Sequence, residues 1–201
     1  MSIVDDYSRR VWMYFLKSKG EALAKFSEWH ALVENQVSRR VKVLRSDNGL
    51  EFCNREFDSY CASHGIMRHR TTPYTPQHNG VAERMNRTLL DKMRSIFATS
   101  GVSKDFWAEA IQTSAYLINM CPSTGIGLKT PMEMWTGFKP DLSVLRSFGY
   151  AAYAHHRDDK LGVRALKCIF LGYPDGVKGY KVWSLEQGKE RLMIDLSIGM
   201  L

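Results

Sequence analysis

The sequence predicts an α/β domain over residues 1–121, a linker over residues 122–147 and a small all-β module over residues 148–201. In the first part, short apolar runs alternate with longer segments whose apolar residues recur every three or four positions. At Pro122 the composition changes to segments bearing Gly, Thr and Pro, which are typical of a linker. Four short β-rich runs then follow between turn residues, and they indicate a small barrel or sheet.

The α/β part opens with a predicted hairpin, in which residues 2–5 and 10–16 are joined by D-Y-S-R. A helix over residues 21–36 follows, and its apolar stripe places Trp29 in the core. Residues 41–46 read as the next strand. Four basic residues surround that strand: Arg39, Arg40, Lys42 and Arg45.

A short helix is predicted after this strand, with Gly65 as its C-terminal cap. Its stripe contains Phe57, Tyr60, Cys61 and His64, so His64 is expected to be a core histidine rather than a metal ligand. Residues 66–70 read as a short edge strand. The side chains expected to be exposed on it are Arg68, His69 and Arg70.

Two longer helices complete the α/β part. The first spans about residues 79–97, and the second spans about residues 104–120, with Ser103 as its N-cap and Pro122 as its stop. The strands of the β module are expected at residues 149–155, 167–173, 179–184 and 190–194.

Two carboxylates mark the candidate site. Asp47 ends the strand V-K-V-L-R-S, and Glu83 lies one turn into a predicted helix, with positions 48–82 between them. Carboxylates at the end of a strand and on a following helix can converge on one hard divalent cation, which prefers oxygen ligands and keeps several waters. Each acid also has a plainer explanation, because D-N-G is a common turn and one Glu on a helix is usually solvated.

The helix that carries Glu83 brings further polar groups to the same face. Asn79, Glu83, Asn86 and Arg87 are related by steps of three and four residues. The forked guanidinium donors of Arg87 and Arg84 suit phosphate oxygens. This face is therefore predicted to contact a phosphate near the metal, although a lone Arg there would simply be solvated.

The composition favours a polyanion as partner. The net charge is +7, from 28 Lys and Arg against 21 Asp and Glu, and contacts from basic residues to phosphates dominate nucleic-acid affinity. No apolar run approaches the ~18 residues of a membrane span, and no signal peptide is recognised. The lack of such a run predicts no membrane association. The four cysteines lack CxxC spacing, so they read as buried thiols of an intracellular protein rather than a disulfide framework or zinc site.

Several motifs resemble the catalytic core of retroviral and retrotransposon integrases, of the copia type. They are R-S-D-N-G-L-E-F, the loop P-Y-T-P-Q-H-N-G and V-A-E-R-M-N-R-T-L, together with V-D-D-Y-S-R-R-V-W-M-Y-F-L, S-F-G-Y-A-A-Y, C-I-F-L-G-Y and K-G-Y-K-V-W. The resemblance covers nearly the whole chain. It implies a ribonuclease-H-like core, with a mixed sheet and flanking helices, followed by a small β module.

The resemblance also implies a function. Such a site uses three acids and Mg²⁺ or Mn²⁺ to join element DNA to target DNA, and Asp47 and Glu83 match the second and third acids. The loop over residues 71–80 would contact the end of the element DNA through Tyr74, His78 and Asn79. Assembly as a homodimer or higher oligomer, and action in the nucleus, are implied in the same way.

The first acid is the difficulty. Asp5 and Asp6 precede a predicted strand, but they match a bend of the family fold and Asp is a usual turn former. The first strand and its Asp are therefore expected to be missing from this chain, which should then show little or no strand transfer. Two alternatives remain open, a non-catalytic DNA-binding relic and a nuclease of the same fold.

Overall fold

The computed structural model describes residues 1–71, 79–155, 165–193 and 197–198. The chain divides into two compact units. Unit 1 comprises residues 1–6 and 11–86, and unit 2 comprises residues 7–10 and 87–201. Within the described residues, no helix combines the length and the apolar character needed to cross a bilayer.

Unit 1 contains two short ladders. Strands β1 (Ser2–Val4) and β2 (Val11–Met13) form the predicted antiparallel hairpin, with Ile3 opposite Trp12. Strands β3 (Val43–Ser46) and β4 (Met67–Arg70) pair in parallel. Helix α2 (Arg55–Ser63) supplies the crossover that a parallel pair requires. No described strand pairs with both ladders, so the predicted mixed sheet is present as two separate pairs.

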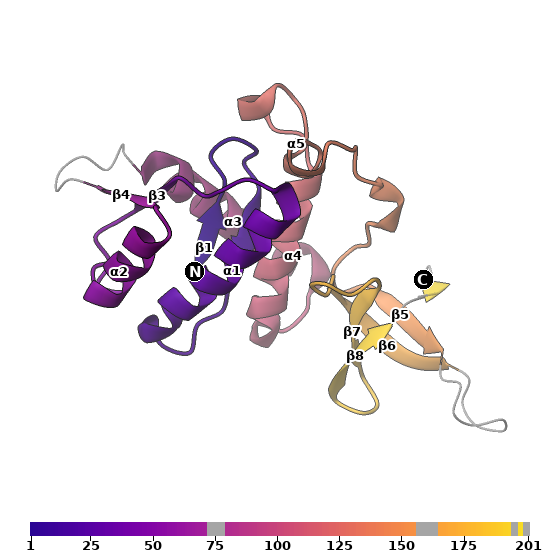
Figure 1. The fold of residues 1–201 in the computed structure, drawn as a ribbon. Coiled ribbons are helices and arrows are strands. Elements are labelled where there is room, and N and C mark those ends of the chain that lie inside the picture. The colour runs from indigo at the N-terminus through magenta and orange to yellow at the C-terminus, as the bar shows by residue number, and fades with distance from the viewer. Residues whose placement is uncertain (72–78, 156–164, 194–196, 199–201) are drawn as a thin grey trace. The chain divides into compact units, whose positions relative to one another are not determined.

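Aromatic side chains fill the core of unit 1. Helix α1 (Ala22–Val37), which follows a 3-10 turn at Lys19–Glu21, buries Phe26 and Trp29 on the predicted stripe. The ring of Phe26 lies 5.2 Å from that of Phe57 on α2, so the two helices pack against each other (Figure 1). Helix α2 begins after Asn54, whose side chain accepts a hydrogen bond from the amide of Phe57 at 2.8 Å.

The prediction of a buried His64 is wrong. The helical turns of α2 end at Ser63, so His64 is the cap residue and its exposed ring stacks on Tyr60 at a centroid distance of 4.2 Å. Gly65 then takes the positive φ of +68° that was expected of the cap region. Among the described residues of this unit, the buried histidine is His30, whose Nδ1 lies 3.0 Å from the Tyr60 hydroxyl.

Helices form one layer of unit 2. The second half of helix α3 (Gly80–Ser100) belongs to it, as does helix α4 (Trp107–Met120), which follows a 3-10 turn at Lys104–Phe106 capped by Ser103 as predicted. The region expected to be a linker contains helix α5 (Pro131–Thr136) and 3-10 turns at Thr124–Ile126 and Leu142–Val144.

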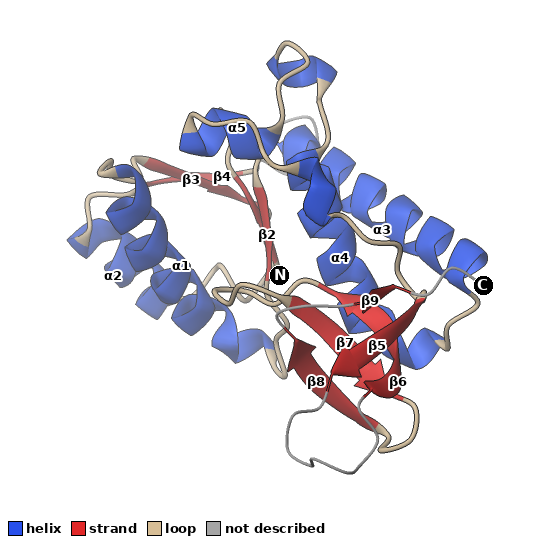
Figure 2. Cartoon of the chain, turned by 90° about the vertical axis from the view of Figure 1, so that its right-hand side faces the viewer, coloured by secondary structure: helices blue, strands red, loops and turns tan. Residues whose placement is uncertain are grey.

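The four predicted strands of the β module are confirmed. They are β5 (Ala151–His155), β6 (Ala165–Gly172), β7 (Tyr180–Ser184) and β8 (Lys189–Met193). A fifth strand, β9 (Ser197–Ile198), was not predicted. Figure 2 shows them as one twisted antiparallel sheet, in the order β8-β7-β6-β5-β9. Ala152, Cys168 and Val182 are fully buried in it.

All four cysteines are free thiols, as predicted. Cys61 and Cys168 are buried, whereas Cys53 is half-buried and Cys121 is exposed. Cys121 departs from the expected burial because it follows the last turn of α4, where the chain becomes extended.

Candidate active site

Asp47 follows the last residue of β3 directly, as the sequence predicts. Its side chain is exposed, and Oδ1 accepts a hydrogen bond from the Gly49 amide at 3.1 Å. This contact closes a tight turn of the kind that Asp often forms. The carboxylate is therefore held at the carboxyl end of the parallel pair, facing solvent.

The turn is fastened to the neighbouring strand on both sides of Asp47. The carbonyl of Ser46 accepts from the Thr71 amide at 3.2 Å, and the side-chain amide of Asn48 donates to the Thr71 carbonyl at 2.8 Å. Thr71 directly follows β4, so β4 and the Asp47 turn are joined beyond the ladder itself. Asn48 was not among the predicted site residues, although its place in D-N-G could have indicated it.

Glu83 lies in the first turn of α3 and is exposed. An acid at this position is favourable in any helix because it faces the positive end of the helix dipole. Asn79 is half-buried just before the helix, and the exposed Arg84 reaches back so that its guanidinium lies over Gly80.

Asn86 has a partner that the sequence did not reveal. The Ser2 hydroxyl on β1 donates to Asn86 Oδ1 at 2.6 Å, which ties the first turns of α3 to the hairpin. Arg87 is exposed on the next position of the helix.

The predicted DNA contacts Tyr74 and His78 lie outside the described residues. Asp5 follows β1 and Asp6 lies in the hairpin turn, so both occupy the bend assigned to them from the sequence. In the part of the chain that is described, no three His, Cys, Asp or Glu side chains gather closely enough to hold a metal ion. The meeting of Asp47 and Glu83 therefore stays a prediction.

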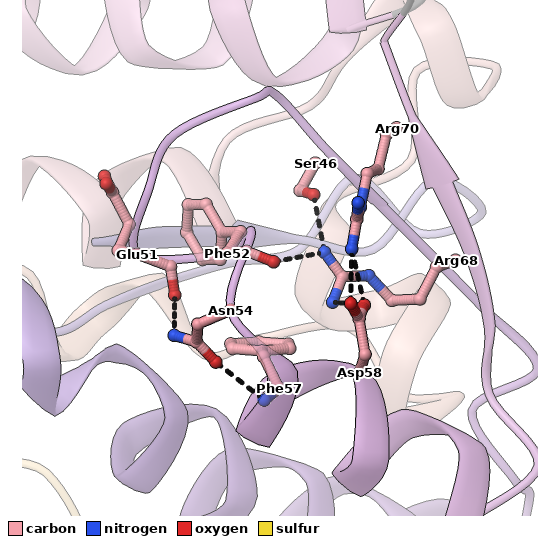
Figure 3. Close-up of polar contacts among 8 residues, drawn as sticks. All are labelled: Ser46, Glu51, Phe52, Asn54, Phe57, Asp58, Arg68 and Arg70. Carbon is pink, nitrogen blue, oxygen red and sulfur yellow. Dashed lines mark hydrogen bonds and ion pairs between the residues drawn. The ribbon is translucent and has the colours of Figure 1, made fainter.

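A charged network lies beside the Asp47 turn (Figure 3). Asp58 on α2 receives two hydrogen bonds from Arg70 at 2.6 and 2.7 Å, and a longer one from Arg68 at 3.4 Å. The hydrogen bond from Arg70 is the main cause that lowers the pKa of Asp58, and the same contact raises the pKa of Arg70. Arg68 was expected to be exposed, but its side chain is only 11% exposed because it turns inward under the loop.

The lowered pKa of Asp58 predicts a pH-dependent contribution to stability. A carboxylate with a depressed folded-state pKa stabilises the fold above its ordinary value of 3.8, and this contribution is lost as the pH falls through the lower folded value. Asp58→Asn should therefore lower the melting temperature slightly at pH 7, and the difference from the unchanged protein should vanish in acid below pH 3.8. The effect is small because the pair is half exposed.

Thermal melts at pH values from 7 to 2 measure this difference. Asp91→Asn is the control, because it removes an exposed carboxylate that contacts Arg94 through a single 2.9 Å hydrogen bond. A difference that stays constant over the whole pH range would contradict the assignment to Asp58 titration.

Comparison with known proteins supports the architecture. The profile of the family Integrase core domain matches residues 1–76, and that of the Retroviral polymerase SH3-like domain matches residues 150–193. The first match includes Asp47, and Glu83 lies beyond its end. The fold is similar to a chain of the simian T-cell lymphotropic virus intasome in complex with PP2A regulatory subunit B56 gamma. The TM-score is 0.55 at 17% identity, over 100% of this chain and 72% of that one.

Sequence similarity extends over most of the chain. It is 46% identical over 186 residues to the retrovirus-related Pol polyprotein from transposon TNT 1-94 of Nicotiana tabacum. It is 34% identical over 173 residues to those from transposons RE1 and RE2 of Arabidopsis thaliana. These matches cover 91% and 85% of this chain, but only 14% and 12% of the relatives, so the chain spans a small part of their length.

Proposed function

This chain belongs to the copia-type integrases of retrotransposon Pol polyproteins, and from that premise we propose that it takes part in metal-dependent joining of element DNA to target DNA. Asp47 and Glu83 are the two acids that it would contribute. The observation that carries the proposal is the placement of Asp47, an exposed carboxylate in a braced turn at the end of a parallel strand.

The side chains suit a hard cation. Both acids are exposed carboxylates, and oxygen ligands with room for water are what Mg²⁺ and Mn²⁺ prefer. When bound, such ions activate an attacking hydroxyl and stabilise charge on the leaving oxygen in phosphoryl transfer. Asp47 and Glu83 would hold the metal, and Arg84 and Arg87 would bind the adjacent phosphates. Tyr74, His78, Asn79 and Asn86 complete the proposed DNA contacts.

Basic side chains near β3 support DNA as the partner. Polyanion binding by Lys and Arg is sequence-independent and weakens steeply with salt. The residues that flank or lie on β3 are exposed, and they would extend the phosphate-binding surface of unit 1: Arg39, Arg40, Lys42 and Arg45. Oligomeric assembly and a nuclear site of action are carried over from the family as part of the same proposal.

No residue of this chain is assigned as the first acid of the site. Asp5 and Asp6 belong to the hairpin bend, and the described residues hold no cluster of three ligating side chains. Because charge stabilisation in a two-metal site depends on its full ligand set, this chain alone should show little or no strand transfer. Robust Mg²⁺-dependent joining that Glu83→Gln abolishes would show that this chain does supply the first acid.

Metal binding tests the proposal without requiring activity. We expect Asp47→Asn and Glu83→Gln each to weaken Mn²⁺ binding by about 100-fold or more, because removing outer-shell partners alone costs about 10–100-fold. Free Mn²⁺ is measured by electron paramagnetic resonance during titration. Glu28→Gln is the matched control, since Glu28 is an exposed helical acid paired with Lys25. Unchanged binding by Asp47→Asn would rule out the proposed metal role.

DNA binding separates the alternatives. A relic that only binds DNA would do so without metal, with an affinity that falls steeply with salt and is the same in Asp47→Asn. A nuclease of the same fold would release hydrolysed ends rather than joined strands, and gel analysis of the products distinguishes the two.

A further inference from the structure

The guanidinium of Arg68 donates hydrogen bonds to three different segments of unit 1. Arg68 lies on β4, opposite Leu44 of β3. Its Nη2 donates to the Phe52 carbonyl at 2.8 Å and to the Ser46 hydroxyl at 3.3 Å, while Nη1 donates to Asp58 Oδ1 at 3.4 Å (Figure 3). One side chain thus joins the end of β3, the following loop and helix α2.

Two of these contacts bracket Asp47. Ser46 directly precedes the acid, and Phe52 ends the turn in which its amide donates to the Gly49 carbonyl at 2.9 Å. Within the loop between them, Asp47, Asn48 and Leu50 are exposed, Leu50 to 82%, whereas Gly49 and Glu51 are half-buried, so packing orders this loop only in part. Hydrogen bonds at its two ends, together with those that join Ser46 and Asn48 to Thr71, therefore restrain where Asp47 lies.

The surroundings hold the guanidinium in place. The guanidinium carbon lies 4.8 Å from the centre of the Phe57 ring. At this distance the face of the aromatic ring attracts the cation. Ser46 is buried, and Asp58 supplies the opposite charge that a poorly hydrated cation needs. Arg68 is consequently a fixed support rather than a mobile surface residue.

Arg70 provides a natural comparison on the same strand. It makes the shorter, two-fold contact with Asp58, at 2.6 and 2.7 Å, and its side chain is 40% exposed. Among the described residues, the side-chain hydrogen bonds of Arg70 go to Asp58 alone. Loss of Arg70 therefore removes a β4–α2 ion pair and leaves the bonds to Ser46 and Phe52 in place.

We infer that Arg68 is a positioning residue for Asp47, because it holds both ends of the exposed loop that presents this carboxylate. The inference rests on the proposed metal role of Asp47. Arg68 does not contact the metal or the DNA; it acts by limiting the positions that the Asp47 carboxylate samples before a metal binds. A lysine cannot replace it, since one ammonium lacks the planar fork that reaches several acceptors at once.

The test compares Arg68→Met with Arg70→Met in the full chain. Arg68→Met should raise the dissociation constant for Mn²⁺ by about 10–100-fold, the usual effect of losing a group that orients a ligand. Arg70→Met should leave it within about 2-fold, although it breaks the shorter contact with Asp58. Amide hydrogen exchange of Gly49, followed by NMR without metal, should accelerate in Arg68→Met but not in Arg70→Met.

Two further variants separate positioning from folding. Ser46→Ala removes one hydrogen-bond acceptor of Arg68 and leaves no charged group without its partner. It should raise the dissociation constant for Mn²⁺ and the exchange rate of the Gly49 amide by less than Arg68→Met does. Arg68→Lys keeps the positive charge, but it should not restore the Mn²⁺ dissociation constant or the Gly49 exchange rate to the values of the unchanged protein. Because Ser46→Ala preserves the ion pairs with Asp58, it remains informative if Arg68→Met does not fold.

The outcomes distinguish the inference from the function on which it rests. If Asp47→Asn weakens Mn²⁺ binding while Arg68→Met and Ser46→Ala do not, the positioning role is overturned and the metal role stands. Equal weakening by Arg68→Met and Arg70→Met would also overturn it, since general loss of stability would then explain both. If Asp47→Asn has no effect on Mn²⁺ binding, the metal role fails, and the positioning role fails with it.

Discussion

Replacing Phe57 by alanine is expected to destabilise unit 1 by about 3–5 kcal/mol, the usual cost of removing a buried Phe side chain. The side chain is fully buried between the rings of Phe26 and Phe52, at centroid distances of 5.2 and 5.7 Å. The cavity would lie directly beneath the Arg68 guanidinium, so the loop carrying Asp47 should loosen as well. Urea unfolding, with hydrogen exchange resolved by segment, measures both effects.

The control for this prediction makes the same chemical change on the surface. Phe138 is 79% exposed, and Phe138→Ala should alter stability by no more than about 0.5 kcal/mol. Equal effects of the two substitutions would mean that the aromatic cluster of α1 and α2 is not the core of unit 1.

Replacing Gly172 by alanine is expected to destabilise unit 2 by about 3 kcal/mol or more, the sum of a backbone penalty and overpacking. Gly172 ends β6 with a φ of +138°, which side-chain-bearing residues rarely adopt. An added Cβ would also meet the Thr113 hydroxyl of α4, which donates to the Leu171 carbonyl at 3.1 Å. The substitution should therefore separate α4 from the β module.

Gly176→Ala is the matched control, because its φ is +69° and nothing lies within 4 Å of an added Cβ. It should show the backbone penalty without the steric one. Segment-resolved hydrogen exchange of β6 and α4 reports the difference between the variants. If Gly172→Ala costs no more than Gly176→Ala, close packing of β6 on Thr113 does not contribute to stability.

Local patterns were sufficient for most elements of this chain. Apolar periodicity and turn residues predicted the hairpin, helices α1 to α4 and strands β3 to β8 to within a few residues. They failed where a residue lies just beyond a helix, as with His64 and Cys121. They also failed for β9, a two-residue strand with too few positions to show a period.

The residues of the candidate site were likewise predicted from the sequence only in part. Motifs with recognisable spacing identified Asp47 and Glu83, and the placement of Asp47 at a strand end follows from its local sequence. The contacts that brace the site join residues far apart in the chain, such as Ser2 with Asn86 and Arg68 with Phe52. No local pattern contains them, because they depend on how the elements pack.

The order of the elements, the family and the two candidate acids can be read along the chain, since periodicity, turn chemistry and motif spacing are local properties. The inward turn of Arg68 towards the Asp47 loop and the contact of Ser2 with Asn86 depend on packing in three dimensions. They cannot be read along the chain because a side chain's partners depend on which segments meet in space. An Arg on an edge strand has the same local sequence whether it faces solvent or a buried carbonyl.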